Sequence, residues 1–497
     1  MTMSSFHIEN FGCRAARADG EAVAARLCAD GLEQGQLATA QVVVVNTCSV
    51  TAEADRDARA FVRRAHRLNP SAKILVTGCY AQRAPLELAA IKGVTAVVGN
   101  SHKALVPQIV KQLESGRQAV VAPRDSMHTA AALLIPTAQL IQAPLIQARL
   151  VQAQLIQAPL IQAPLIQGMV PGAQHQEQTT SLWVDDSFAH SAIESAQVAP
   201  GAQTRPNLKI QEGCANRCTF CIIPTTRGAS RSLGEARVLE QARGFVEAGG
   251  NELVLSGINL GRWGRDLAPA TNLARLVRRV VTETGLLRLR LSSIEPMDWT
   301  AELIALMSEF GGTRLARHAH LPLQSGSDAV LRRMHRRYRP WHYTEKVAAL
   351  ASAAGESLAL GADVMVGFPG ESEAEFTETY DLIASLPLTY LHLFPFSPRP
   401  GTRAWKMQQE TPVAPQAVRE RMQALGQLAD QKSAAFRARM RGTPLPAITL
   451  NTPASIAAKG RTLALTDNFI EVEVAESLAA NQLIAVCMDD HKLARKL

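Results

Sequence analysis

Residues 207–221 read NLKIQEGCANRCTFC, a short strand pattern that runs directly into three closely spaced cysteines. The spacing of Cys214, Cys218 and Cys221 allows one loop to wrap three thiolates around a single metal cluster. Thiolates are soft ligands, which favour an iron–sulfur cluster or zinc. Three cysteines leave one metal position without a protein ligand, so the pattern favours an iron–sulfur cluster over a closed zinc site. A structural metal or buried thiols are the alternatives.

Strand and helix patterns alternate on both sides of this cysteine loop. Downstream, the strand patterns are at 207–213, 251–257, 286–293, 316–323, 358–368 and 389–396. Helical patterns between them predict a partial or full barrel of parallel strands. Because there are six such units, we expect a partial (β/α)6 barrel. Upstream, apolar runs at 41–48, 73–79 and 94–100 predict an open parallel sheet of Rossmann or flavodoxin type. The tail after a helical pattern at 414–439 contains short alternating runs, which predict a small β-domain and an α/β fold class overall. This tail resembles the TRAM domain, which implies a small C-terminal β-barrel.

Residues 124–203 differ in kind from the rest of the chain. They hold two basic and five acidic residues, and residues 138–167 are six tandem pentapeptides such as APLIQ. The prolines of this low-complexity repeat disfavour a continuous helix. We expect a poorly ordered insertion, with a short pentapeptide solenoid as the alternative.

Composition restricts the class of protein. The chain has 497 residues, 47% of them hydrophobic, which is enough for substantial buried cores. The net charge is +8, and the acidic insertion leaves +11 on the remainder, which suits an anionic partner such as RNA. Neither a membrane span nor a signal-peptide pattern is visible, so we expect a cytoplasmic protein whose eight cysteines serve metal or redox chemistry.

A second set of cysteines follows three strand patterns. Cys13, Cys48 and Cys79 end the runs HIENFGC, VVVVNTC and ILVTGC. Because ligands gather at the carboxyl ends of parallel strands, these three cysteines can meet in space. The neighbouring glycines Gly12 and Gly78 allow a close backbone approach. Three ordinary buried cysteines are the alternative, and we expect Cys28 and Cys487 to be small core residues.

The cysteine patterns resemble the radical S-adenosylmethionine (SAM) methylthiotransferase family. C-x3-C-x2-C is similar to the radical SAM signature, and FGCR, VNTCSVT and TGCYAQ resemble the family's N-terminal domain. The resemblance implies two [4Fe-4S] clusters, one on each cysteine triad, with SAM bound to the open iron of the first and Phe220 near its adenine. Ala16 departs from the asparagine that is usual in the family, which puts one local hydrogen bond in doubt, whereas Asp19 keeps the acidic position.

The same resemblance extends to the loops behind the first triad. It implies that five residues at strand ends line the cavity for SAM and substrate: Ser256, Gly257, Glu295, Gln324 and Asp363. It gives no metal role to the histidines of HAH (318–320), which we expect to be structural. The implied domains are a methylthiotransferase N-terminal domain (4–122), the insertion (123–203), a radical SAM core (204–436) and a TRAM-like RNA-binding domain (437–497).

Two basic segments are candidates for RNA phosphate contacts. RRMHRRYRP (332–340) carries Arg332, Arg333, Arg336, Arg337 and Arg339. FVRRAHRLNP (61–70) forms a second basic face. A solvated helix face is the alternative for both.

The motif variants NTCSVT, TGCYAQ and RGASRS resemble the subgroup that methylthiolates C2 of N6-threonylcarbamoyladenosine at position 37 of tRNA. The implied partners are tRNA, an electron donor of flavodoxin or ferredoxin type and a sulfur source, and we expect a monomer. The alternatives are a methylthiotransferase acting on isopentenyladenosine in tRNA or on a ribosomal-protein aspartate, and a non-catalytic RNA-binding protein with structural metal.

Overall fold

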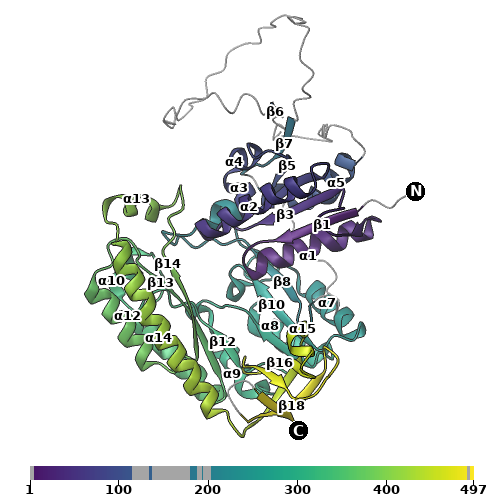
Figure 1. Cartoon of the computed structure of the whole chain (residues 1–497). Helices are drawn as coiled ribbons and strands as arrows, with labels where there is room; N and C mark the ends of the chain where they lie inside the picture. The colour runs from purple at the N-terminus through teal and green to yellow at the C-terminus, as the bar shows by residue number, and fades with distance from the viewer. Residues whose placement is uncertain are drawn as a thin grey trace, which may run out of the picture.

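The computed structural model describes residues 5–114, 134–136, 179–186, 188, 193, 203–489 and 493–497. The chain forms an N-terminal sheet, a central group of parallel strands and a small C-terminal barrel (Figure 1). The predicted pentapeptide repeat at 138–167 lies outside the described residues. None of the described helices combines the length and the apolar character that a membrane crossing needs.

The N-terminal sheet has the strand order β2-β1-β3-β4-β5-β7-β6. The predicted strands appear as β3 (Val42–Thr47), β4 (Lys73–Gly78) and β5 (Val94–Gly99), which pair in parallel. Every residue of β3 is buried, as its continuous β-branched run predicts. The remaining elements are β1 (Ser5–Asn10), β2 (Glu33–Gln34), α1 (Arg14–Ala29), α2 (Ala52–Leu68), α3 (Cys79–Arg83), α4 (Pro85–Ala89) and α5 (Val106–Glu114).

The last two strands on one side of this sheet come from the range that we assigned to the insertion. The strand β7 (Thr179–Trp183) pairs in parallel with β5, and β6 (Leu134–Pro136) pairs antiparallel with β7. Leu182 and Trp183 are buried in the cores on the two faces of the sheet. The run TTSLW is too short to stand out in a low-complexity context, so sequence patterns did not reveal this strand.

The central region holds six parallel strands in two groups. One sheet has the order β11-β10-β8-β9 and the other the order β12-β13-β14. A single parallel bridge from Leu289 to Leu315 lies between them, so the strands form a partial barrel, as predicted. The six parallel strands are β8 (Asn207–Glu212), β10 (Glu252–Gly257), β11 (Arg288–Leu291), β12 (His318–His320), β13 (Ala359–Val366) and β14 (Tyr390–Pro395). The short strand β9 (Arg231–Ser232) pairs antiparallel with β8.

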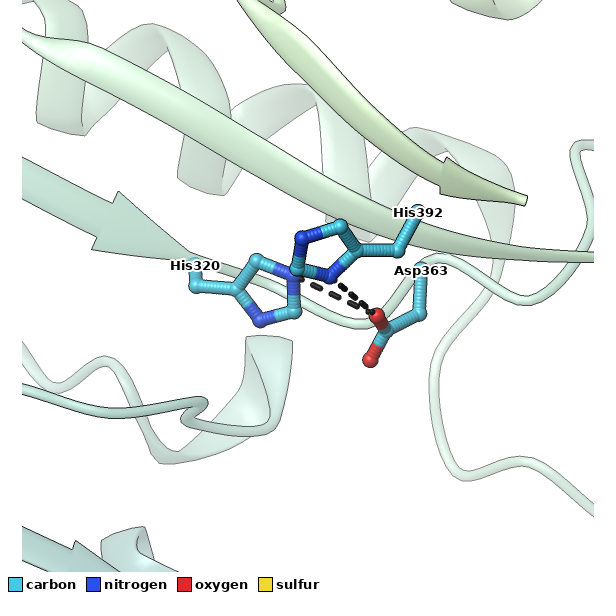
Figure 2. A group of neighbouring side chains, drawn as sticks. All are labelled: His320, Asp363 and His392. Carbon is cyan, nitrogen blue, oxygen red and sulfur yellow. Dashed lines mark hydrogen bonds and ion pairs between the residues drawn. The ribbon is translucent and has the colours of Figure 1, made fainter. Parts of the chain in front are cut away.

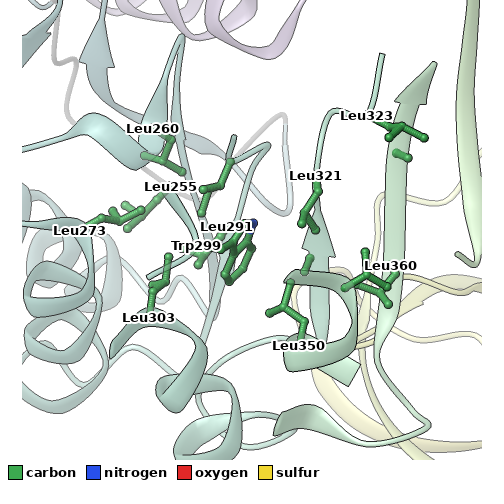
Figure 3. Close-up of a cluster of buried hydrophobic side chains, with 14 of the residues drawn as sticks. Leu255, Leu260, Leu273, Leu291, Trp299, Leu303, Leu321, Leu323, Leu350 and Leu360 are labelled. Carbon is green, nitrogen blue, oxygen red and sulfur yellow. The ribbon is translucent and has the colours of Figure 1, made fainter. Parts of the chain in front are cut away.

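Helices cover the outside of this partial barrel and enclose its main apolar core. Leu255, Leu291 and Leu360 from the strands share that core with Trp299 and Leu303 (Figure 3). The helices are α7 (Glu235–Glu247), α8 (Leu273–Glu283), α9 (Ala301–Phe310), α10 (Asp328–Arg333), α11 (Pro340–Ala354), α12 (Glu373–Ser385) and α13 (Arg403–Glu410).

Local sequence signals explain where several helices begin. Ser372 and Glu375 form a reciprocal capping box at the start of α12. The side chains of Thr51 and Asn272 accept backbone hydrogen bonds at the starts of α2 and α8. The helix α2 ends at Leu68 and has Asn69, directly before Pro70, as its C-cap, because a residue before proline disfavours helical geometry.

The C-terminal barrel closes the lower end of the partial barrel. The helix α14 (Pro415–Arg439) leads into the closed barrel β15-β16-β17-β19-β18. Its strands are β15 (Pro444–Thr449), β16 (Thr462–Thr466), β17 (Glu471–Val474), β18 (Leu483–Met488) and β19 (Leu493–Lys496). The turn between β16 and β17 packs the ring of Phe469 against His318 and Tyr390, with centroids 4.4 and 5.3 Å away.

Polar contacts fix this turn in place. Arg290 of β11 donates hydrogen bonds to the carbonyl oxygens of Thr466 and Asp467, both at 3.1 Å. Arg317 forms a two-bond ion pair with the Asp467 carboxylate at 2.6 and 3.0 Å. His318 and Tyr390 are the first residues of their strands, so the turn forms the floor of the partial barrel, at the end opposite the cysteine loop.

Candidate active site

The loop of Cys214, Cys218 and Cys221 begins where β8 ends. The Cys221 amide donates to the Cys218 carbonyl oxygen at 3.1 Å, which turns the chain back within the loop. The Asn216 amide and the Asn259 side chain donate to the Cys214 sulfur at 3.4 and 3.6 Å. The thiols are close enough to influence one another's charge, and burial raises the pKa of Cys221 to about 12. Three neighbouring sulfurs with amide donors around them fit a thiolate-bound cluster, because the cluster's positive iron favours the ionised thiols that burial disfavours.

The second triad gathers at the carboxyl edge of the N-terminal sheet, as predicted. Cys13 precedes α1, Cys48 follows β3, and Cys79 begins α3 after β4. Gly12 has a φ of 102°, and a Cβ there would lie 2.5 Å from the Cys48 sulfur. Glycine is therefore required for the chain to pass so close to Cys48.

The two thiols Cys13 and Cys48 are hydrogen-bonded to each other, with Cys48 as the donor. A hydrogen bond from Cys48 is the main cause that lowers the pKa of Cys13 to about 6; burial opposes the shift and the charge of Arg227 adds to it. The same hydrogen bond, together with burial, raises the pKa of Cys48. One thiolate is thus already favoured at neutral pH, which suits a metal ligand.

The other two cysteines have different surroundings. Cys487 is buried, as predicted. Cys28 is exposed, so its prediction as a core residue was wrong. The buried face of α1 runs through Val23 and Leu27, and Cys28 lies one position further around the helix.

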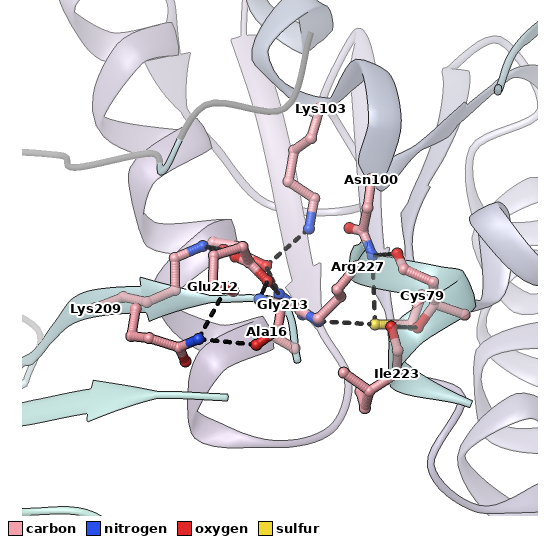
Figure 4. A network of polar contacts seen from close by, with 12 residues as sticks. Ala16, Cys79, Asn100, Lys103, Lys209, Glu212, Gly213, Ile223 and Arg227 are labelled. Carbon is pink, nitrogen blue, oxygen red and sulfur yellow. Dashed lines mark hydrogen bonds and ion pairs between the residues drawn. The ribbon is translucent and has the colours of Figure 1, made fainter. Parts of the chain in front are cut away.

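Arg227 links the two cysteine triads. It ends α6 (Ile223–Arg227), the short helix after the Cys214 loop, and its Nε donates to the Cys79 sulfur at 3.2 Å. Asn100 donates both to the same sulfur at 3.4 Å and to the Thr226 carbonyl oxygen at 2.8 Å (Figure 4). The N-terminal domain and the partial barrel therefore meet directly between the two triads.

A buried charge network surrounds this link. Arg227 pairs with Glu212 at 2.7 Å and with Asp19 at 3.1 Å, and Lys103 reaches Asp19 at 2.9 Å. Lys209 also contacts Asp19 and Glu212. Burial opposes ionisation of Glu212, but Arg227 and Lys209 outweigh it and lower its pKa to about 2. The cations outweigh burial at Asp19 too and hold its pKa well below its usual range. Buried charges need such pairing to be tolerated.

Ala16 takes part in the packing of the N-terminal domain through its backbone. Asn46 of β3 donates to the Ala16 carbonyl oxygen and to the Asn10 side chain, the latter at 3.0 Å. The backbone at this position thus accepts a hydrogen bond that needs no side chain from residue 16.

Polar side chains at the strand ends remain available for a ligand. Within the described part of the chain, Ser256 Oγ, Asn259 Oδ1 and Gln324 Oε1 are buried without a hydrogen-bond partner. Buried polar atoms normally have partners, so a polar ligand such as SAM fits here. Phe220 packs against the main core, and a Cβ on Gly257 would lie 2.8 Å from Gln211.

Glu295 lines a cavity of about 310 Å³ next to Cys218. Its carboxylate pairs with Arg336, which also donates to the Cys218 sulfur at 3.2 Å. Asp363 lies deeper on β13 and contacts His320 and His392. Glu295 thus lies beside the cysteine loop, whereas Gln324 adjoins Asp363, whose carbonyl oxygen accepts a hydrogen bond from the Gln324 amide at 2.8 Å.

The five arginines of 332–339 differ from one another. Arg332 and Arg339 pair with Asp328 at 2.8 and 3.0 Å, and Arg333 pairs with Glu375 at 2.8 Å. Arg336 is buried against the Cys214 loop, so its contacts do not match the predicted role in phosphate binding. Arg337 is exposed, and no ion pair of its side chain occurs among the described residues. A basic hollow of about 400 Å³ is lined by Arg217, Arg332, Arg336, Arg337 and Arg339.

A second basic hollow lies on the N-terminal domain. It has a volume of about 620 Å³, and Arg59, Arg63 and Arg67 of α2 line it together with Lys92. Arg63 and Arg67 belong to the segment 61–70, which the sequence predicts to form a second basic face.

Comparison with known proteins identifies two families. Residues 5–99 match the family model described as "Uncharacterized protein family UPF0004", and residues 208–383 match the radical SAM superfamily. The two matches contain one cysteine triad each.

Relatives match nearly the whole chain. The threonylcarbamoyladenosine tRNA methylthiotransferase MtaB of Bacillus subtilis is 33% identical, covering 95% of this chain and 90% of the relative. The protein of the same name from Treponema pallidum is 32% identical, covering 95% of both chains. A tRNA-2-methylthio-N(6)-dimethylallyladenosine synthase from Geobacter metallireducens is 31% identical, covering 80% of this chain and 77% of the relative. With this likeness and with a cysteine triad in each matched domain, the chain belongs to the radical SAM methylthiotransferases, enzymes that use SAM and [4Fe-4S] clusters.

Proposed function

We propose that this enzyme methylthiolates C2 of N6-threonylcarbamoyladenosine at position 37 of tRNA. The observation that carries the proposal is the contact of Arg227, which follows one cysteine triad in the chain, with the Cys79 sulfur of the other at 3.2 Å. A methylthiotransferase needs its two cluster sites at one cavity. The substrate is proposed from the names of the relatives that match over most of the chain.

The cysteines have separate roles in this proposal. Cys214, Cys218 and Cys221 would hold the cluster that binds SAM, and Cys13, Cys48 and Cys79 would hold the auxiliary cluster. When bound, these groups supply the electron, the hydrogen-abstracting species and the sulfur of the reaction. The chain holds the two sites in place: Arg227 and Asn100 donate to the Cys79 sulfur, and Arg336 donates to the Cys218 sulfur.

Residues at the strand ends would hold the polar cofactor. Ser256, Gly257, Glu295 and Gln324 lie at or just beyond strand carboxyl ends, and Phe220 would pack near the adenine. Asp363 would face the substrate. Ser256 and Gln324 support this role because their buried oxygens have no other partner among the described residues.

The surfaces for tRNA are proposed from charge. The hollow along α2 presents three arginines and one lysine, which suit phosphate groups. Arg337 and the neighbouring 332–339 segment offer a second contact, and the TRAM-like barrel (437–497) a third. A target base must leave its stack to reach a buried cavity. We infer that the enzyme works as a monomer in the cytoplasm, where tRNA, a flavodoxin- or ferredoxin-type donor and a sulfur source are present.

Nucleoside analysis tests the substrate. In a strain that lacks this gene, tRNA digests should lose 2-methylthio-N6-threonylcarbamoyladenosine and accumulate the unmethylthiolated nucleoside, as measured by mass spectrometry. The wild-type gene should restore the product. The Cys218→Ser and Cys48→Ser variants should not, because each removes a proposed cluster ligand.

The control is Cys28→Ser, which changes an exposed cysteine outside both triads and should restore the product fully. Loss of the methylthio-isopentenyladenosine nucleoside instead would favour isopentenyladenosine as the substrate. The name of the relative from Geobacter metallireducens suggests this alternative. An unchanged nucleoside profile would contradict a tRNA substrate and point to the ribosomal-protein alternative.

A further inference from the structure

Three potential metal ligands that belong to neither cysteine triad meet on neighbouring strands of the partial barrel. Asp363 of β13 and His392 of β14 are directly paired in the parallel register of the two strands. His320 ends β12, the strand on the other side of β13. Figure 2 shows the two imidazole rings and the carboxylate turned toward one another. The backbone of one sheet therefore places all three side chains together before any ligand binds.

The distances suit a shared cation. One Asp363 oxygen, Oδ1, lies 3.4 Å from His320 Nε2 and 3.2 Å from His392 Nδ1. The donor atoms of the three residues all lie within 4.8 Å of one another. Ligand atoms around a small tetrahedral ion are separated by about 3.3 Å, from metal–ligand bonds of about 2.0 Å. His392, whose side chain is 56% exposed, is the least enclosed of the three ligands, whereas His320 is 5% exposed.

A second contact orients the most buried ligand. The other ring nitrogen of His320, Nδ1, shares a hydrogen bond of 2.7 Å with the Ser293 hydroxyl. With its proton on Nδ1, the ring presents the lone pair of Nε2 toward Asp363. Metal-binding histidines usually have such a partner on the far nitrogen.

His318, the other histidine of the HAH segment, provides a contrast. Its Nε2 contacts the Tyr390 hydroxyl at 2.8 Å, and its ring packs on Phe469. These contacts agree with a structural role for His318. His320 instead faces Asp363 and His392. Local alternation puts both rings on one face of the strand but does not distinguish their partners.

We propose that His320, Asp363 and His392 bind a divalent transition-metal ion of the zinc class. Two imidazoles and one carboxylate favour zinc or ferrous iron over magnesium or calcium. Three protein ligands leave a coordination position for water or a substrate oxygen, as in catalytic rather than structural sites. The charge of Arg14 also reaches Asp363 and opposes a cation, so we expect weaker binding than at a structural zinc site.

Zinc binding by the cluster-loaded enzyme tests the proposal. With both cysteine triads occupied by reconstituted clusters, their thiolates do not compete for the probe. The enzyme, freed of loosely bound metal with a mild chelator, is dialysed against Zn²⁺, and iron and zinc are counted by mass spectrometry. Wild type should bind one zinc per chain in addition to its iron. His392→Ala should bind at least tenfold more weakly with unchanged iron content, because one of three ligands is lost.

Two further variants make the test specific. Ser293→Ala should weaken zinc binding about tenfold or more while keeping all three ligands, since it removes only the orienting hydrogen bond. His7→Ala is the matched control, because His7 also lies beside a carboxylate, Glu9 at 3.7 Å, but far from this site in the fold. Absence of the additional zinc in wild type, or equal binding by wild type and His392→Ala, would overturn the proposal. Neither result depends on which substrate the enzyme methylthiolates.

Discussion

At the scale of single residues, the surroundings of each sulfur decide its chemistry. Cys13 receives a hydrogen bond from Cys48 and feels the charge of Arg227, whereas burial dominates at Cys221. The two thiols therefore have pKa values on opposite sides of neutral pH. In the cluster-free protein this difference separates a reactive thiolate from an inert thiol.

The expected consequence is a pH-dependent labelling of Cys13. Its pKa of about 6 means that the thiolate predominates at pH 7.5 and is protonated as the pH falls through 6. Alkylation of the apoprotein by iodoacetamide, followed peptide by peptide with mass spectrometry, should decline below about pH 6 at Cys13. Cys221 should stay almost unlabelled over the same range, since burial raises its pKa. Labelling of Cys13 that begins only above pH 8 would contradict this account.

At the scale of elements, the strands were largely predictable and the contacts between them were not. The run 41–48 predicted β3 because a continuous β-branched run is typical of a parallel strand that is buried on both faces. The cysteine positions followed from the rule that parallel strands end at one edge. The contact of Arg227 with Cys79 joins residues 148 positions apart, and no local pattern encodes such a separation. His392 was missed for the same reason, since its partner Asp363 is its neighbour only in the folded sheet.

The strand β7 leads to a prediction about the insertion. Trp183 is 6% exposed and packs in the core that includes Val98 and Val106. Trp183→Ala should lower the free energy of unfolding of the N-terminal domain by about 3–5 kcal/mol, through lost burial and the cavity left behind. Urea unfolding followed by circular dichroism measures this change.

The matched change is deletion of residues 138–167, the pentapeptide repeat, which lies outside β6 and β7. We expect the unfolding midpoint and the nucleoside product of this variant to remain those of wild type. Loss of the product with an unchanged midpoint would show that the repeat takes part in function.

At the scale of the whole molecule, one domain supplies each cluster site and a buried charge network joins them. Arg227 and Lys209 of the central region pair with Asp19 of α1. Removing one partner would leave a buried charge without compensation, which is strongly destabilising. The two triads are therefore held in a fixed relation rather than connected by a flexible linker.

Iron content tests the two-site architecture. Anaerobic reconstitution of wild type should give about eight iron atoms per chain, four from each [4Fe-4S] cluster. Cys48→Ser should retain about four and still cleave SAM, whereas Cys218→Ser should retain about four and lose cleavage. Cys28→Ser should keep about eight. A wild-type content of only four would contradict a cluster on the N-terminal triad.

The turn that carries Phe469 also determines when the barrel can be completed during synthesis. All six triad cysteines lie within the first 221 residues, but the floor of the partial barrel comes from residues 466–470, much later in the sequence. Domains fold as the ribosome delivers them, the N-terminal part first. The lumen therefore stays open from below until residues 466–470 have been translated, long after the sulfur ligands. A nascent or truncated chain that ends before β16 would expose His318 and Tyr390 to water, however well its sulfur ligands were arranged.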